Sequence, residues 1–420
     1  MYGYNQNQQM NPNMMYQQPM GQNMMYPQQM GQMGQMGQNM MYPQQMGQMG
    51  QMGQNMMYPQ QMGQMGQMGQ NMMPQQMGQM GQMGQMGQMG QNMMPQQMGQ
   101  MGQMNQMGMQ QPINQSQIDA DAAALRKAMK GLGTDEKAII QIVANRTNAQ
   151  RQAMIQSFKR QFNRDLIKDL KSELSGKFED TIIALFDDPI TYDCKSLFHA
   201  MKGAGTNEDT LIEILSTRPN YYINQIKQKY QILYKKSLEE RLKQELSGDL
   251  KKVMLTLVSG QRGENQMPNQ NDCMNKAQQL YKAGEGKIGT NEELFYQILT
   301  MSSPQELMLI NQYYMQIGKG NDLMKAIDKE FSGNMKKLLQ TLVYSSINPS
   351  EYFATRINHA VKGQGTKDTL LMRIVITRDE IDMPLIKQAY MRLYQKDLVQ
   401  VIKKETSGDY KKLLVELVSH

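Results

Sequence analysis

The sequence lacks the residues on which several kinds of site depend. It contains no tryptophan, three histidines and two cysteines, Cys194 and Cys273. The cysteines lie in different segments, which predicts reduced thiols, buried or on the surface, and not a disulfide framework. Because histidine is so scarce and no nucleophile motif occurs, no catalytic set can be assembled. We therefore expect a protein that is not an enzyme.

The first 112 residues lack both charge and the side chains that build a core. They contain only Met, Gln, Gly, Asn, Pro and Tyr, and the first charged side chain is that of Asp119. Such a segment cannot offset the entropy cost of ordering, so residues 1–112 are predicted to be a disordered tail. Its NMMYPQQMGQ and MGQ repeats contain too little proline for a collagen helix.

Long apolar runs and targeting signals are also missing. The N-terminus has no basic region followed by an apolar stretch, and nowhere do 18 uncharged apolar residues follow one another. We therefore expect a cytoplasmic protein. The net charge of +7 and the pI of about 9.0 come from the rest of the chain, and they suit nucleic acid and anionic lipid equally well.

The remaining 300 or so residues contain a repeated pattern. The passages KGLGTDE, KGAGTNE, KIGTNEE and KGQGTKD begin at Lys130, Lys202, Lys287 and Lys362, and a Ser-Gly pair begins 45 residues after each of these lysines. The period of about 70 to 85 residues indicates repeats that stack on one another. The predicted repeats cover residues 113–188, 189–260, 270–346 and 348–420.

Apolar residues recur at helical spacing within each repeat, for example at Ile139, Ile140 and Val143. No run of useful length alternates with period two, so we predict an all-α fold with five short helices per repeat. Thr134 and Asp135 carry a helix-start signal. The glycines of the Ser-Gly pairs are expected to end helices in the left-handed conformation. They are Gly176, Gly248, Gly333 and Gly408.

The glycine loops suit a calcium ion. Calcium takes six to eight oxygen ligands, and glycine lets a chain curl until successive carbonyl oxygens point at one centre. The missing negative charge comes from a distant acid: Gly133 precedes Glu173 by forty residues, and the other three loops repeat this separation to within one residue. The same register in four loops indicates a shared role.

A K-G-x-G-T loop followed by 38 residues and an acid resembles the calcium-binding signature of the annexin family, and the resemblance covers residues from about 113 to 420. It implies a curved all-α disc with the loops on its convex face, where calcium bridges to lipid phosphoryl oxygens. The implied ligands are backbone carbonyl oxygens and one carboxylate per repeat. They are Met129, Gly131, Gly133 and Glu173; Met201, Gly203, Gly205 and Glu245; Gly284, Lys287, Gly289 and Glu330; and Val361, Gly363, Gly365 and Glu405.

The same resemblance implies lesser sites beside each loop. These would use the threonine carbonyl oxygen and an acid two residues later, namely Glu136, Glu208, Glu292 or Asp368. Leu132 and Ile288 lie at loop tips and would either dip into the lipid headgroups or pack against a neighbouring loop. The third loop, GEGKIG, also matches G-x-G-x-x-G, but the segment before it reads as a helix and not as the strand that a dinucleotide site needs.

The function expected from these features is calcium-dependent binding to anionic phospholipid membranes, including phosphatidylserine, by a cytoplasmic protein that is peripheral on membranes when calcium rises. The tail is either a spacer or a self-associating segment that adds vesicle aggregation, trafficking or repair. The alternatives are an RNA-binding or condensate protein and a scaffold whose core only docks. Nucleic acid is disfavoured because Lys and Arg are interspersed with acids and no recognition motif appears.

Overall fold

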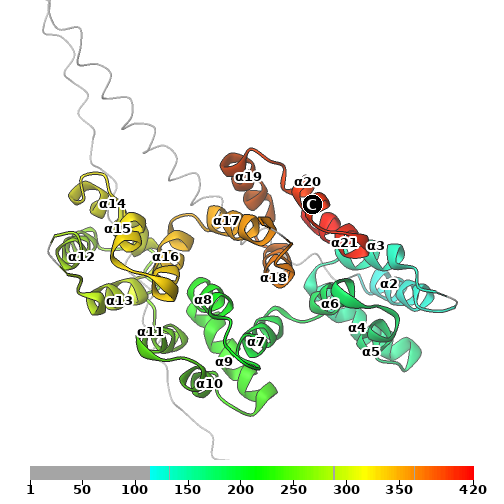
Figure 1. Cartoon of the computed structure of the whole chain (residues 1–420). Coiled ribbons are helices and arrows are strands. Elements are labelled where there is room, and N and C mark those ends of the chain that lie inside the picture. Colours follow the sequence, from blue (N-terminus) through cyan, green and yellow to red (C-terminus); the bar gives the residue numbers. More distant parts are fainter. Residues whose placement is uncertain (1–113, 132, 287–288, 364) are drawn as a thin grey trace, which may run out of the picture. The chain divides into compact units, whose positions relative to one another are not determined.

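The computed structural model describes residues 114–131, 133–286, 289–363 and 365–420 (Figure 1). The predicted disordered tail, residues 1–112, lies outside the described residues. Within these ranges the chain forms 20 α-helices and no β-strand, in four groups of five. This confirms the predicted all-α fold of five helices per repeat.

The first two repeats each contain five helices in the same order. Repeat 1 contains α2 (Gln115–Ala128), α3 (Glu136–Ala144), α4 (Asn148–Phe162), α5 (Leu166–Glu173) and α6 (Gly176–Leu185). Repeat 2 contains α7 (Pro189–Ala200), α8 (Glu208–Thr217), α9 (Asn220–Tyr234), α10 (Leu238–Glu245) and α11 (Gly248–Val258).

The last two repeats follow the same order. Repeat 3 contains α12 (Gln270–Ala283), α13 (Glu292–Met301), α14 (Pro304–Ile317), α15 (Leu323–Glu330) and α16 (Gly333–Ile347). Repeat 4 contains α17 (Pro349–Val361), α18 (Asp368–Arg378), α19 (Met383–Tyr394), α20 (Leu398–Glu405) and α21 (Gly408–Ser419).

Local sequence signals explain where these helices begin. Asp135 is the N-cap of α3, and its side chain accepts a hydrogen bond from the backbone N–H of Ala138, as its position predicts. The glycines of the Ser-Gly pairs do have left-handed φ angles, for example +61° at Gly176. The prediction that they end helices is wrong, however, because each is the first residue of the following helix. The preceding helix has already ended three residues earlier, for example at Glu173.

The repeats bury their apolar side chains in pairs. One hydrophobic core joins repeat 1 to repeat 4, and a second joins repeat 2 to repeat 3. Figure 1 shows the consequence for the first pair, where α21 near the C-terminus lies beside α3. Cys194 and Cys273 both lie in the second core as free thiols, which confirms that they form no disulfide. Each repeat therefore depends on a partner to complete its core.

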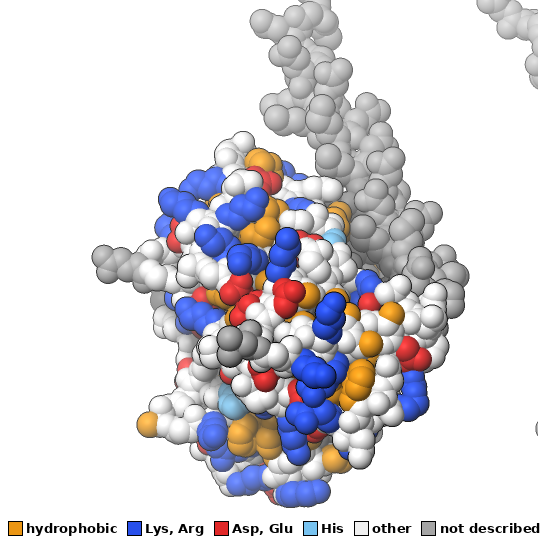
Figure 2. All heavy atoms as spheres, turned by 90° about the vertical axis from the view of Figure 1, so that its right-hand side faces the viewer, with side chains coloured by type: hydrophobic (Ala, Val, Ile, Leu, Met, Phe, Trp, Pro, Cys, Tyr) orange, Lys and Arg blue, Asp and Glu red, His pale blue; other side chains and the backbone are white. Residues whose placement is uncertain are grey.

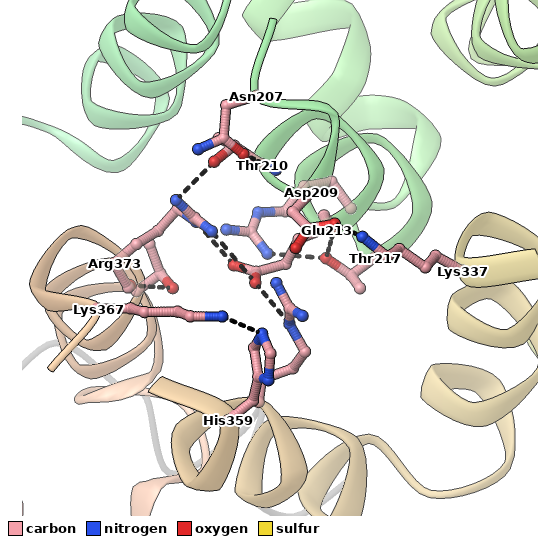
Figure 3. Close-up of polar contacts among 12 residues, drawn as sticks. Asn207, Asp209, Thr210, Glu213, Thr217, Lys337, His359, Lys367 and Arg373 are labelled. Atoms are coloured by element: carbon pink, nitrogen blue, oxygen red, sulfur yellow. Dashed lines mark hydrogen bonds and ion pairs between the residues drawn. The ribbon is translucent and has the colours of Figure 1, made fainter. Parts of the chain in front are cut away.

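A buried ion pair links the two pairs of repeats. Glu213 of α8 accepts hydrogen bonds from Arg373 of α18, with Nε at 2.8 Å from Oε1, and from Arg356 of α17 at 3.3 Å (Figure 3). Arg373 also donates to Thr210 at 3.1 Å. Burial opposes ionisation, but the charges of Arg373 and Arg356 outweigh it and hold the pKa of Glu213 below its ordinary value. The carboxylate therefore stays ionised between repeats 2 and 4.

Candidate metal centre

Each glycine loop is closed by the same backbone hydrogen bond. In repeat 1 the N–H of Asp135 donates to the carbonyl oxygen of Ala128 at 2.9 Å, and in repeat 2 the N–H of Asn207 donates to that of Ala200 at 2.8 Å. The third and fourth loops repeat this bond from Asn291 and from Lys367. The bond brings the two ends of the loop together, so the residues between them must turn outward.

Positive φ angles produce this turn. Gly131 and Gly133 have φ angles of +125° and +86°, a region that a residue with a Cβ atom rarely adopts. The second and fourth loops use their glycine pairs in the same way, with φ between +83° and +122°. Within the part of the chain that the structure describes, no donor bonds to the carbonyl oxygens of Gly131 or Gly133. These oxygens are therefore available to a cation.

The distant glutamates lie beside their loops. The hydroxyl of Thr134 donates to Oε2 of Glu173 at 3.1 Å, and that of Thr206 donates to Oε2 of Glu245 at 3.4 Å. In repeat 3, Thr290 bonds the carboxylate of Glu330 in the same way. In repeat 4, Thr366 donates to the backbone oxygen of Glu405 at 2.8 Å and not to its carboxylate. The separation of about 40 residues thus brings each acid to its own loop.

The four glutamates share an unfavourable place in the secondary structure. Each is the last residue of an eight-residue helix, namely α5, α10, α15 or α20. The carbonyl end of a helix carries partial negative charge, so a carboxylate there is destabilised unless a cation is close. Together with neutral carbonyl oxygens and an exposed loop, this carboxylate is a donor set that fits calcium. The residues present therefore fit the ion that the pattern implies.

The third loop departs from the other three. Gly284 has a φ of −118°, and Gly289 has the positive φ of +82°. A Cβ atom placed on Gly284 would meet Glu330 Cγ at 3.4 Å, so the glutamate lies against this part of the loop. Lys287, the remaining predicted ligand of this loop, lies outside the described residues, as do the loop-tip residues Leu132 and Ile288. Of the three predicted carbonyl donors of this loop, the structure therefore describes Gly284 and Gly289.

Glu285 of the third loop has a role that the repeated pattern does not predict. Its carboxylate accepts hydrogen bonds from Lys329 at 2.7 Å, from Tyr314 at 3.1 Å and from Asn321 at 3.1 Å. Burial tends to raise the pKa of Glu285, but the hydrogen bonds from Lys329 and Tyr314 outweigh it and hold this pKa below its usual value. Glu285 therefore ties the loop to α14 and α15. The sequence feature that could have pointed to Glu285 is its position between two glycines of the loop, Gly284 and Gly286.

The acids predicted for the lesser sites each begin the helix that follows a loop. Glu136, Glu208, Glu292 and Asp368 are the first residues of α3, α8, α13 and α18. An acid is favourable at this end of a helix without any metal. Two of these carboxylates are also engaged elsewhere, because Glu292 accepts from Tyr296 at 2.7 Å and Asp368 pairs with Lys177 of α6. The helix-start role accounts for their positions.

Residues of repeats 1 and 4 line one hollow. Its volume is about 730 Å³, and Glu173 from repeat 1 and Glu405 from repeat 4 both line it. Three further carboxylates, those of Glu136, Asp368 and Asp409, line it with two lysines. The excess of acids favours cations in this space. The predicted ligands Glu173 and Glu405 therefore border the same space.

Four helical repeats, each with a glycine loop held against a helix-terminal glutamate, define a repeat protein whose loops offer oxygen donors that suit a cation. The sequence model of the annexin family matches the chain four times, over residues 120–185, 192–257, 275–342 and 352–417. This chain belongs to the annexin family. Annexins are non-enzymatic proteins that bind calcium and phospholipid, and this membership supports the expectation that the chain is not an enzyme.

Individual annexins agree with this assignment. Annexin A7 of Homo sapiens is 46% identical over 298 residues, which cover 71% of this chain and 61% of that relative. The solved structure of annexin III has a TM-score of 0.70 at 40% identity and covers 72% of this chain and 94% of that chain. The crystal structure of calcium-bound annexin (Sm)1 has a TM-score of 0.65 at 34% identity, covering 72% and 90%. The chain spans about three fifths of the length of its annexin A7 and A11 relatives.

Proposed function

We propose that this chain binds anionic phospholipid membranes reversibly, through calcium ions held by its glycine loops and the glutamates beside them. The observation that carries the proposal is that each glutamate lies beside the loop about 40 residues before it in the sequence. Threonine hydroxyls of the loops donate to the carboxylates of Glu173 and Glu245. The calcium-bound state of annexin (Sm)1, a structural relative, supports the choice of ion. Calcium would supply the positive charge to which lipid phosphate oxygens bind.

The number of ligands makes each loop a weak site by itself. Three carbonyl oxygens and one bidentate carboxylate leave coordination positions for other oxygens, and low-charge sites of this kind bind calcium at about 10⁻⁴ to 10⁻³ M. A membrane changes this balance, because the surface potential of an anionic leaflet, about −30 mV, concentrates cations near it. Several loops that engage one membrane also raise the effective concentration of the others. The chain would therefore respond to calcium and anionic lipid together.

The protein surface favours this proposal over binding to nucleic acid. Figure 2 shows Lys and Arg side chains mixed with Asp and Glu over the face that lies on the right in Figure 1, so this face is not uniformly basic. Among the described residues, no helix is long and apolar enough to cross a bilayer. Association at the membrane surface, through the exposed loops, is the mode that the proposal requires.

Sedimentation with phosphatidylserine vesicles at varied calcium tests the proposal. We expect the full chain to pellet with the vesicles in calcium and to return to solution when a chelator is added. A variant that lacks residues 1–112 should bind in the same way but should not cluster the vesicles, since we also propose that the tail self-associates. Binding that ignores chelator would refute calcium dependence, and clustering that survives the deletion would make the tail a spacer.

A further inference from the structure

An arginine of the chain itself contacts two of the proposed calcium ligands in repeat 2. Arg241 lies in α10, four residues before Glu245. Its Nη2 donates to the carbonyl oxygen of Met201 at 2.5 Å and lies 3.1 Å from Oε1 of Glu245. Met201 O and the Glu245 carboxylate are the two ends of the proposed donor set in this repeat. The guanidinium group therefore lies where the ion would have to bind.

The other three repeats have no such group. The residues four positions before Glu173, Glu330 and Glu405 are Asp169, Ala326 and Val401, and none of these side chains is a cation. Asp169 itself accepts two hydrogen bonds from Arg164, at 2.6 and 2.8 Å. Among the described residues, Glu245 forms an ion pair with a basic side chain, whereas the other three glutamates form none. Repeat 2 thus differs from the other repeats in that a positive side chain pairs with its loop glutamate.

A guanidinium and a calcium ion cannot share these oxygens. Calcium would need to lie about 2.3 to 2.6 Å from each of them, so it would lie close to the Nη2 atom, and the two positive charges would repel. The arginine is also incompletely satisfied, because its Nε is buried without a hydrogen-bond partner. About a quarter of its side chain is exposed, at 26%. The contact therefore occupies two of the proposed ligands, and it can be broken because part of the arginine side chain is open to solvent.

We propose that Arg241 acts as a built-in competitor for calcium in repeat 2. It neutralises Glu245 and occupies the Met201 carbonyl oxygen when calcium is low, and it must leave before the ion binds. Repeat 2 then fills at a higher calcium concentration than the site of repeat 4, which carries Val401 at the same position. This inference rests on the proposed function of the loops. It gives the protein a graded response in which one of its sites requires stronger calcium signals.

The test isolates the repeat 2 site in the full chain. Glu173→Gln, Glu330→Gln and Glu405→Gln together remove the carboxylates of the other loops, and Arg241→Val is then added to one of two otherwise identical proteins. Calcium chloride is titrated without lipid, and the rise in the thermal unfolding midpoint reports binding, with isothermal titration calorimetry as a second readout. We expect Arg241→Val to lower the calcium required for the half-maximal shift about tenfold, since one competing charged hydrogen bond is removed.

The reciprocal exchange controls for indirect effects. Val401 is half-buried, as is Arg241, so Val401→Arg can be placed in a chain that keeps only Glu405 among the four carboxylates. We expect this substitution to raise the calcium requirement of repeat 4 about tenfold. The unfolding midpoint without calcium shows whether each variant is folded.

The possible outcomes distinguish a failure of the inference about Arg241 from a failure of the proposed calcium binding. An unchanged or higher calcium requirement after Arg241→Val would overturn the inference and leave the proposed function intact. Absence of any calcium response in the chain with all four loops unaltered would instead refute the proposed function, and the competitor with it.

Discussion

Substitution of the four loop glutamates by glutamine should abolish calcium-dependent membrane binding at calcium concentrations that saturate the unaltered chain. The substitutions are Glu173→Gln, Glu245→Gln, Glu330→Gln and Glu405→Gln. Glutamine keeps the shape of the side chain and can still accept the threonine bond that Glu173 and Glu245 accept. It removes the charge that a divalent ion requires. Losing one interaction with a charged group costs about 1.5–3 kcal/mol, which is about 10- to 100-fold in affinity per site.

Vesicle sedimentation across a calcium titration measures this effect, and the expected increase in the calcium requirement is more than about 100-fold, because several weak sites act together. A matched control removes four carboxylates that are not loop ligands. Its substitutions are Asp180→Asn, Glu264→Gln, Asp272→Asn and Glu416→Gln. The control should bind like the unaltered chain. Equal loss of binding in both variants would show that only the overall charge matters.

Glu213→Gln should lower the free energy of unfolding by about 3–5 kcal/mol at neutral pH, the usual cost of removing one partner of a buried ion pair. Glu213 is 1% exposed and lies between Arg373 and Arg356 of repeat 4. The substitution leaves two arginines without their counter-charge. Denaturant unfolding measures the loss. Asp249→Asn, which breaks the exposed pair with Lys252, is the control and should change stability by less than about 1 kcal/mol.

The same substitution should change how stability depends on pH. The pKa of Glu213 is lower in the folded protein than its ordinary value of 4.5, since Arg373 and Arg356 outweigh the effect of burial. A lowered carboxyl pKa stabilises the fold above pH 4.5, and this stabilisation is lost as the pH falls below 4.5. The unaltered chain should therefore lose stability on acidification more steeply than Glu213→Gln. Parallel pH profiles for the two proteins would contradict this account.

Features that repeat along the chain could be predicted from the sequence. The helical spacing of Ile139, Ile140 and Val143 belongs to α3, where all three are buried. The loop glycines and the glutamates 40 residues later could be paired because the same separation occurs four times, so the fold need not be known in advance. The pairing of each loop with its acid is thus a property of the repeat and not of the whole molecule.

Features that occur once depended on packing between repeats or on the orientation of one side chain. The bond from Arg373 to Glu213 joins residues 160 positions apart, and no periodicity connects them. The sequence around Arg241 shows only an arginine four positions before a glutamate, which is a common pair on a helix and indicates no competitor for a metal. Its contact with Met201 arises only where α10 meets the loop after α7. The Ser-Gly glycines begin helices although their φ angles are left-handed, so a glycine pattern alone does not tell the start of a helix from its end.

A crystal structure of the full chain grown with calcium would show whether the loops and their glutamates hold the ion. We expect an ion about 2.3 to 2.6 Å from the carbonyl oxygens of Met129, Gly131 and Gly133 and from the carboxylate of Glu173, with the corresponding atoms of the other repeats arranged in the same way. Calcium bound elsewhere, with Glu173 turned away from its loop, would contradict this expectation.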